Sequence, residues 1–200
     1  VPDLHYNINK EHRLNYQSEV LRVLVQISEI RDKYLKTGYS VKLIFLGDVI
    51  DGPINNAGDA MRCQNLMRYY AALFDGIYCV VGNHELNNIA SNPFWFMISS
   101  VNDESLHKLD KAIQPQGIED IFIVPDIIED GEVTFYFNHY GVPVKTPAAD
   151  GVSIGLFHQN VGSLDICKMW GTFTDVEEAS FIQSYQYSYF GHMHLAYGKY

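Results

Sequence analysis

Residues 41–52 read VKLIFLGDVIDG, an apolar run followed by a polar turn. The run 41–46 is short and bounded by turn residues, which predicts a buried strand. Gly47 follows it directly, and glycine permits the sharp backbone turn that aims the next side chain, Asp48, across the end of the strand. Ligands of open α/β sheets bind outside the carboxyl ends of the strands. This stretch therefore predicts an α/β fold and the place of a site within it.

The same arrangement, a strand followed at once by polar residues, recurs along the chain. The apolar run 77–81 precedes a second polar turn, and the strand-like runs 152–157 and 187–190 precede two others. The polar residues of these three turns are Gly82-Asn83-His84-Glu85, His158 and Gly191-His192-Met193-His194. An Asp-x-His sequence, Asp3-Leu4-His5, lies near the start of the chain. Because the ends of neighbouring strands lie close together, we expect these polar residues to meet in one site.

Helices and further strands surround these turns. Apolar residues spaced three and four apart predict two helices in the first half. An Asn-Pro pair and a Thr-x-x-Glu capping box predict two more. The predicted helices cover residues 16–36, 60–74, 94–101 and 174–185. The second half is richer in strands, and Asp130-Gly131 predicts a hairpin turn between two of them. We expect one domain over residues 1–200, an α/β layered β-sandwich with flanking helices.

The net charge constrains the function. The 200-residue chain carries a formal net charge of -10, which argues against a broad basic face that grips DNA by charge alone. Ten of its 24 acidic residues lie in 101–150, so we expect the acidity on a solvated face. The charge does not exclude a nucleic-acid enzyme that binds its own metal cations.

The cysteines and the apolar runs indicate a compartment. The three cysteines, Cys63, Cys79 and Cys167, have no C-x-x-C spacing and are interpreted as buried thiols of a reducing compartment. No apolar run approaches about eighteen residues, and no signal peptide opens the chain. We therefore expect a cytoplasmic protein with no membrane partner.

The polar residues have the chemistry of metal ligands. Carboxylates, an asparagine and several histidines combine hard oxygen donors with borderline nitrogen donors, a set that suits Mn²⁺, Fe or Zn²⁺ better than Mg²⁺ or Ca²⁺ alone. About seven ligands are too many for one ion, so we expect two divalent ions about 3.5–4 Å apart, with Mn²⁺ favoured and one carboxylate shared. Such a pair activates water and holds both the attacking and the leaving oxygen of a phosphoryl centre.

The order D-x-H, GD-x-x-D, GNH[DE], H and GH-x-H, spread from Asp3 to His194, resembles the calcineurin-like metallophosphoesterase superfamily. Within it the chain is most similar to SbcD-type DNA-repair exonucleases, including phage versions. GH-x-H is compact, Gly52-Pro53 rather than arginine follows Asp51, and a long predicted helix separates the first two blocks. Glu85 favours other members, since these nucleases more often carry Asp at that place.

The resemblance implies a role for each polar residue. Asp48 would bridge the two ions. His84 would orient the scissile phosphate or protonate the leaving oxygen, and Asp51 would hold His84 from behind. A hydroxide shared by the ions would attack phosphorus in line. The first ion would be bound by Asp3, His5 and His194, and the second by Asn83, His158 and His192.

Some assignments have competitors. His139 competes with His158 for the lone-histidine block. His158 is favoured because the run 152–157 before it is more clearly a buried strand than the run before His139. The aromatic residues 94–96 could stack on nucleotides near the site, but a packed helix face is the favoured interpretation.

The first block has an unusual context. Asp3 and His5 follow only Val1 and Pro2, whereas the family places this block directly after a buried strand, where proline fits poorly. Either that strand is cut off, or the two residues imitate a block lost upstream. Since the chain also continues only to Tyr200 after His194, we expect a catalytic core trimmed at one or both ends.

Three functions are compatible with these residues. The resemblance implies a two-metal DNA exonuclease or endonuclease, a phosphodiesterase, with an SMC-like ATPase as its partner. The alternative is a phosphomonoesterase for a phosphoprotein or a small-molecule phosphate. A binding module that keeps the fold without activity is disfavoured, because such a module need not keep a complete set of ligands.

Overall fold

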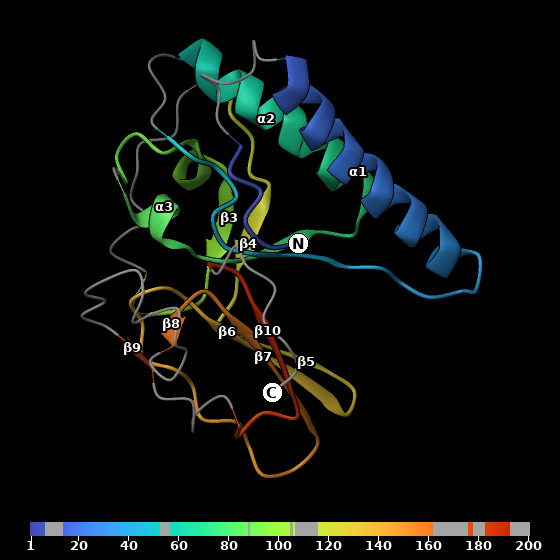
Figure 1. Ribbon diagram of the computed structural model, residues 1–200, viewed down its shortest axis with the longest axis vertical. Coiled ribbons are helices and arrows are strands. Elements are labelled where there is room, and N and C mark those ends of the chain that lie inside the picture. The colour runs from blue at the N-terminus through green and yellow to red at the C-terminus, as the bar shows by residue number, and fades with distance from the viewer. Residues whose placement is uncertain are drawn as a thin grey trace.

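Two four-stranded β-sheets face each other, and two long helices cover the outer face of one of them (Figure 1). The computed structural model describes residues 1–6, 14–52, 57–87, 89–104, 106, 116–161, 176–177 and 183–192. This layered arrangement confirms the predicted α/β sandwich with flanking helices.

The first sheet is entirely parallel, with the strand order β1-β2-β4-β3. Strands buried on both faces have continuous apolar sequences, which is why the runs at β1 and β2 were recognisable. The two long helices lie at the predicted places. The elements of this layer are α1 (Leu14–Leu35), β1 (Leu43–Leu46), α2 (Ala57–Leu73), β2 (Ile77–Val80), β3 (Ile98–Val101) and β4 (Phe122–Val124).

Side chains of β1 alternate between two hydrophobic cores. Leu43 and Phe45 join the larger core, which also contains Val20 of α1 and Met67 of α2. Leu46 lies on the opposite face of the strand, as the two-residue period of a strand requires. The smaller core between the two sheets consists of the buried residues Leu46, Val80, Phe137 and Leu156.

The second sheet has the order β10-β7-β6-β5. Only β5 and β6 pair in an antiparallel direction, and the last residue of β5, Asp130, pairs with Val133 across a tight turn in which Gly131 has a φ of 64°. The predicted hairpin is therefore confirmed. The strands of this sheet are β5 (Ile127–Asp130), β6 (Val133–Asn138), β7 (Val152–Phe157) and β10 (Tyr187–Phe190).

The N-terminal segment lies along the outer edge of the first sheet. The main-chain N–H of Leu46 donates to the carbonyl of Val1 at 2.9 Å, and Tyr6 forms a parallel bridge with Ile50. Because β1 is the edge strand of its sheet, Pro2 interrupts no central ladder. This segment carries the first polar block alongside the loop that follows β1.

Two predicted helices are wrong in part. Residues 94–101 begin as a 3₁₀ helix, η2 (Pro93–Phe96), but continue as strand β3 paired with β4, where Ile98 and Val101 favour a strand. Within the predicted helix 174–185, Val176–Glu177 forms strand β9, which pairs with β8 (Asn160–Val161), and residues 174–175 and 178–182 lie outside the described residues. A short helix, α3, covers Asn83–Leu86. In the described part of the chain, no helix combines the length and apolar character needed to cross a bilayer.

Candidate metal centre

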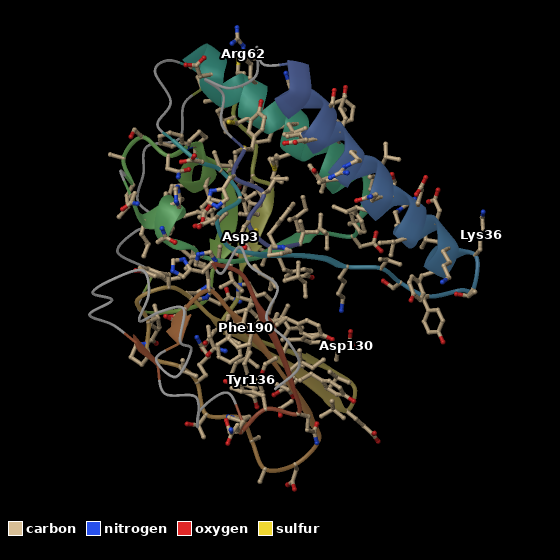
Figure 2. The ribbon with its side chains drawn as sticks, viewed as in Figure 1. Asp3, Lys36, Arg62, Asp130, Tyr136 and Phe190 are labelled. Atoms are coloured by element: carbon tan, nitrogen blue, oxygen red, sulfur yellow. The ribbon has the colours of Figure 1, made fainter. Side chains whose placement is uncertain are left out.

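The predicted site residues lie where the carboxyl ends of strands from both sheets meet. β1 leads to Asp48, β2 to Asn83, β7 to His158 and β10 to His192. Figure 2 shows Asp3, from the N-terminal segment, at the level where the two sheets meet. Five segments that are far apart in the sequence therefore contribute to one site.

Asp48, His158 and His192 form one group, called here the His158 group, in which a ligand atom of each residue lies within 4.8 Å of the others. Nε2 of His158 lies 3.2 Å from Oδ2 of Asp48 and 3.1 Å from Oδ1 of Asn83. Nδ1 of His192 lies 2.9 Å from the same Asn83 oxygen. The three predicted ligands of the second ion and the predicted bridging carboxylate are thus together.

The His158 ring is oriented by the main chain. Its Nδ1 atom lies 2.7 Å from the carbonyl oxygen of Leu46, the last residue of β1, and the side chain is fully buried. A carbonyl can only accept, so Nδ1 carries the proton and donates it. The other nitrogen, Nε2, is then directed at Asp48 and Asn83, which is how a histidine ligand is usually held.

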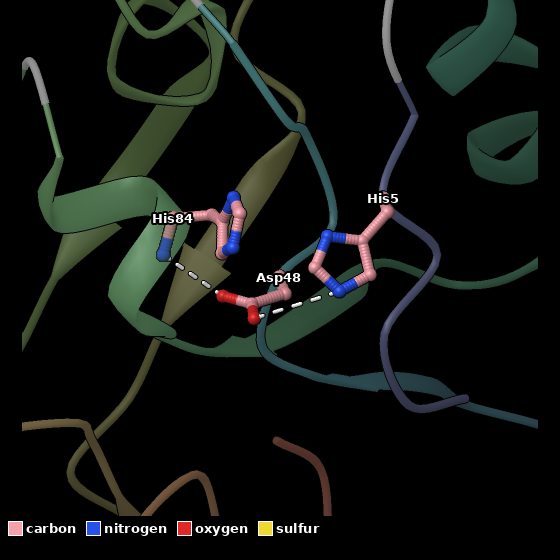
Figure 3. A group of neighbouring side chains, drawn as sticks. All are labelled: His5, Asp48 and His84. Carbon is pink, nitrogen blue, oxygen red and sulfur yellow. Dashed lines mark hydrogen bonds and ion pairs between the residues drawn. The ribbon is translucent and has the colours of Figure 1, made fainter. Parts of the chain in front are cut away.

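Asp48 also belongs to a second group, the His5 group, with His5 and His84 (Figure 3). Its ligand atoms again lie within 4.8 Å of one another. Nε2 of His5 lies 3.7 Å from Oδ2 of Asp48, and the main-chain N–H of His84 donates to Oδ1 of Asp48 at 2.9 Å. The rings of His5 and His84 meet edge to face, with centroids 4.7 Å apart. Among the described residues, Asp48 is the member common to both groups.

Asp3 lies in the site but outside both groups. Its Oδ1 atom accepts a hydrogen bond from the main-chain N–H of His192 at 2.7 Å and lies 4.0 Å from Nδ1 of His158. This carboxylate oxygen therefore fixes the loop after β10. His194, the remaining predicted ligand of the first ion, lies outside the described residues.

Asp51 and His84 form the pair that the sequence predicted. Nδ1 of His84 lies 2.9 Å from Oδ1 of Asp51, and both side chains are partly exposed. A carboxylate at Nδ1 fixes the orientation of the ring. His84 is held by its main chain to Asp48 and by its side chain to Asp51, so its ring has a defined place at the edge of the site.

The backbone is strained at the candidate ligands. Within the described residues, the non-glycine residues with positive φ are Asp3 (47°), His5 (47°), Asp48 (49°) and His192 (73°). Such conformations cost free energy and persist where a function requires them. All four residues belong to the predicted ligand set, so the strain marks the same site independently of side-chain distances.

The glycines of the motifs leave space for the candidate ligands. A Cβ atom on Gly47 would lie 2.2 Å from Nδ1 of His158, and Gly47 also has a φ of 86°. A Cβ atom on Gly82 would lie 2.2 Å from Oδ1 of Asp48. The polar turns therefore need glycine chiefly for close approach, in addition to the bend that the sequence indicated.

Glu85 has a role that sequence reasoning missed. Its fully buried carboxylate accepts hydrogen bonds from the main-chain N–H groups of Asp48 (2.8 Å), Val49 (2.8 Å), Ile50 (3.2 Å) and Gly82 (2.9 Å). Burial, followed by the charge of Asp48, raises the pKa of Glu85. Glu85 joins the loop after β1 to the turn after β2. Its place in the GNH[DE] block was the one signal, and the spacing did not indicate what it would contact.

Asn92 is a second missed residue that shapes the site. Its Nδ2 atom donates to the carbonyl of Ile50 at 3.2 Å and to the carbonyl of His84 at 2.9 Å. Its Oδ1 atom accepts from the main-chain N–H of Phe94 at 3.0 Å, which is the N-cap bond expected from the Asn-Pro pair. Asn92 therefore joins the loop after β1 and the turn after β2 to the start of η2.

The competing histidine, His139, is placed elsewhere. It is fully buried, its Nδ1 accepts a hydrogen bond from the main-chain N–H of Val81 at 3.0 Å, and its Nε2 lies 3.1 Å from the carbonyl of Pro125. Burial lowers the pKa of His139 to about 4. Both ring nitrogens serve the main chain, so the ring joins the ends of β2 and β4 to β6. The aromatic residues Phe94, Trp95 and Phe96 are buried in the core, as the packed interpretation expected.

The electrostatics of the cluster suit a cation. Burial alone would raise the pKa of Asp48, but hydrogen bonds from His158 and the His84 main chain, with the charge of His158, lower it. Burial alone would lower the pKa of His158, but the hydrogen bond and charge of Asp48 raise it. The cluster therefore favours added positive charge. Its imidazole, carboxylate and amide donors match Mn²⁺, Fe or Zn²⁺, so the residues present fit a divalent metal.

The fold and the site define a layered α/β protein with a candidate metal centre of histidine, carboxylate and amide donors at its strand ends. The family model of calcineurin-like phosphoesterases matches residues 1–196, so the chain belongs to this family. It is accordingly a metal-dependent hydrolase of phosphoesters, as the motif series indicated. No curated protein and no solved structure gives a significant match to the chain.

Proposed function

We propose that the protein is a phosphodiesterase that cleaves DNA with two divalent ions, of which Mn²⁺ is the favoured choice. The observation that carries this proposal is that Oδ2 of Asp48 lies 3.7 Å from Nε2 of His5 and 3.2 Å from Nε2 of His158, between the two sets of predicted ligands. A carboxylate shared by two ligand groups is the arrangement that a two-metal site requires. When bound, the ions neutralise charge on the phosphoryl oxygens and activate water.

Each side chain has a defined task in this proposal. Asn83, His158 and His192 would hold one ion together with Asp48. His5 would hold the other, with Asp3 and His194 as its further ligands. Support comes from the convergence of the described members and from the backbone strain at Asp3, His5, Asp48 and His192.

His84 serves the leaving group. An imidazole that Asp51 holds through Nδ1 presents Nε2 to the site and can give a proton to the leaving oxygen. Asp51 holds the ring in the orientation that this step needs. The hydrogen bond from the His84 main chain to Asp48 keeps this acid beside the carboxylate shared by the two groups.

The charge of the site supports a diester substrate. A phosphomonoester carries close to two negative charges near pH 7, and a diester carries one. Gly52, rather than arginine, follows Asp51. In the described part of the chain, Arg31, Arg68 and Lys145 form ion pairs with acidic residues outside the two groups. Since these described Arg and Lys pairs lie outside both groups, the site is better matched to the singly charged diester.

An SMC-like ATPase is the proposed partner. The motif series is most similar to nucleases of the SbcD type, and the net charge of -10 leaves the chain without a strong electrostatic attraction for DNA. A partner with its own basic surface would supply that attraction.

The proposal is tested by comparing substrates under Mn²⁺. We expect hydrolysis of bis-p-nitrophenyl phosphate to exceed hydrolysis of p-nitrophenyl phosphate in kcat/KM, and we expect cleavage of a labelled DNA strand under the same conditions. Preference for the monoester would instead support the phosphomonoesterase and would contradict the nuclease proposal. A His84→Asn variant serves as the background control for contaminating nucleases.

A further inference from the structure

Tyr140 lies beside the His158 group although no motif includes it. It follows β6, and its ring centroid is 5.6 Å from that of His192 and 6.2 Å from that of His158. The ring is tilted by 47° to His192, and the side chain is only partly buried. One edge of the proposed metal centre is therefore an aromatic ring with a surface open to solvent.

The loop that carries Tyr140 is fixed to the site by several hydrogen bonds. The main-chain N–H of Tyr140 donates to the carbonyl of Val81 at 2.9 Å. The main-chain N–H of Val142 closes a turn onto the carbonyl of His139 at 3.2 Å. The Gln159 side chain donates to the carbonyls of His139 and Val142. Gln159 directly follows His158, and Val81 directly precedes Gly82-Asn83-His84-Glu85. These bonds therefore fix the main chain at Tyr140 relative to both motifs.

Tyr140 and His84 flank different halves of the site. His84 belongs to the His5 group, whereas Tyr140 contacts both histidines of the His158 group, and Asp48 lies between the two groups. Among the described residues, the Tyr140 hydroxyl takes part in no hydrogen bond, so the side chain is not needed to tie the loop together. The main chain at Tyr140 is fixed, its ring is partly exposed, and its side chain does not hold the loop in place. Such a ring is suited to contact with substrate.

We propose that Tyr140 is a specificity residue that stacks against the nucleoside remaining esterified to the scissile phosphate. This inference rests on the proposed function, in which His84 serves the leaving oxygen on the other flank. Stacking of bases on aromatic side chains tolerates any base sequence and typically contributes about tenfold or more to affinity per base. The residue would therefore favour nucleotide diesters over simple alkyl diesters without reading a sequence.

The test uses two diesters with the same leaving group. Thymidine 5′-monophosphate p-nitrophenyl ester and methyl p-nitrophenyl phosphate both release p-nitrophenol, so they differ only in the group that stays on phosphorus. The variants are Tyr140→Ala and Tyr140→Phe, and Tyr69→Ala is the matched control because Tyr69 is 66% exposed on α2, a helix that carries none of the candidate ligands. Mn²⁺ binding is measured by calorimetry for each variant.

We expect Tyr140→Ala to raise KM for the thymidine ester about tenfold and to leave the methyl ester and Mn²⁺ binding unchanged. Tyr140→Phe keeps the ring and should resemble the unmodified protein, as should Tyr69→Ala. Equal effects on both esters, loss of Mn²⁺ binding in Tyr140→Ala, or a Tyr140→Phe defect as large as that of Tyr140→Ala would overturn the inference.

Binding of thymidine 5′-monophosphate under Mn²⁺ separates this inference from the proposed function. If the unmodified protein hydrolyses neither diester, the proposed function fails. In that case, about tenfold weaker binding of the nucleotide to Tyr140→Ala would still support the stacking contact. Equal binding to both proteins would contradict it.

Discussion

Nδ1 of His84 lies 2.9 Å from Oδ1 of Asp51, while the main-chain N–H of the same histidine donates to Asp48 at 2.9 Å. The candidate general acid is thus fixed at both ends, by one carboxylate that both groups share and by another that belongs to neither. The proposal gives proton delivery to His84, which lies in the His5 group, so substitution of His84 tests whether metal binding and proton delivery are separate tasks.

His84→Asn should remove proton delivery and leave the metal centre in place. We expect kcat for a diester to fall by roughly 10²–10⁴-fold, the usual contribution of a positioned acid, with unchanged Mn²⁺ stoichiometry by calorimetry. Asp51→Asn should cost less, about 10–100-fold, because it weakens only the support of the ring. Asp32→Asn, on the exposed part of α1, is the control. Full activity of His84→Asn would remove the residue from the mechanism.

Gly47→Ala should disturb the site through a steric clash. Gly47 and Gly38 have φ values of 86° and 84°, but an added Cβ meets His158 at 2.2 Å in the first and nothing within 4 Å in the second. Gly38→Ala should cost about 1–2 kcal/mol from the left-handed backbone alone. Gly47→Ala should cost roughly 2 kcal/mol more through overpacking and should weaken Mn²⁺ binding. Equal losses in urea denaturation would show that space at Gly47 is not required.

The strand ends could be predicted from the sequence because each apolar run is followed at once by its polar residues. β1 with Asp48 and β7 with His158 are local patterns, visible within about ten residues. Strand β3 was missed because residues 94–101 start with a genuine Asn-Pro cap, and the pairing of Ile98 with β4 depends on residues more than twenty positions later. Local propensity favours a helix there, but pairing with β4 makes the segment a strand.

Glu85→Gln should destabilise the loops after β1 and β2. Oε1 accepts from Val49 and Ile50, and Oε2 accepts from Asp48 and Gly82. Whichever way a glutamine amide is turned, its NH₂ group faces two buried N–H donors. We expect a loss of about 3 kcal/mol in the free energy of unfolding, together with weaker Mn²⁺ binding.

The matched control is Glu119→Gln, since Glu119 is exposed and pairs with Arg68 on the surface. That substitution should change stability by less than about 1 kcal/mol. If denaturation curves of Glu85→Gln and Glu119→Gln coincide, the buried carboxylate does not organise the loops as its hydrogen bonds imply.

His139 should make the fold sensitive to acid. Burial lowers its pKa to about 4 in the folded protein, against 6.5 for an ordinary histidine. The unfolded chain therefore binds a proton between these values that the folded protein does not, and stability falls as the pH is lowered from 7 toward 4. The contribution is roughly 3 kcal/mol. His139→Gln should lack it, so its free energy of unfolding should fall less steeply with pH. Parallel curves for the two proteins would contradict the prediction.

The arrangement of the site could be predicted only in part. The sequence indicated the ligand types and their order, but not that Glu85 would reach three consecutive main-chain amides or that Asn92 would join two loops. Such contacts follow from the distance between loops that are about 35 residues apart in the chain, for which hydrophobic periodicity carries no signal. His84 lies beside His5 in the His5 group, although the resemblance implied a role for His84 outside the metal ligands.

The central claim is that Asp48 is shared by two metal ions, and anomalous diffraction from crystals soaked in Mn²⁺ tests it most directly. The account predicts two anomalous peaks about 3.5–4 Å apart, both in contact with Asp48, one also with Asn83, His158 and His192 and the other with His5. A single peak, or two peaks that do not share Asp48, would contradict it.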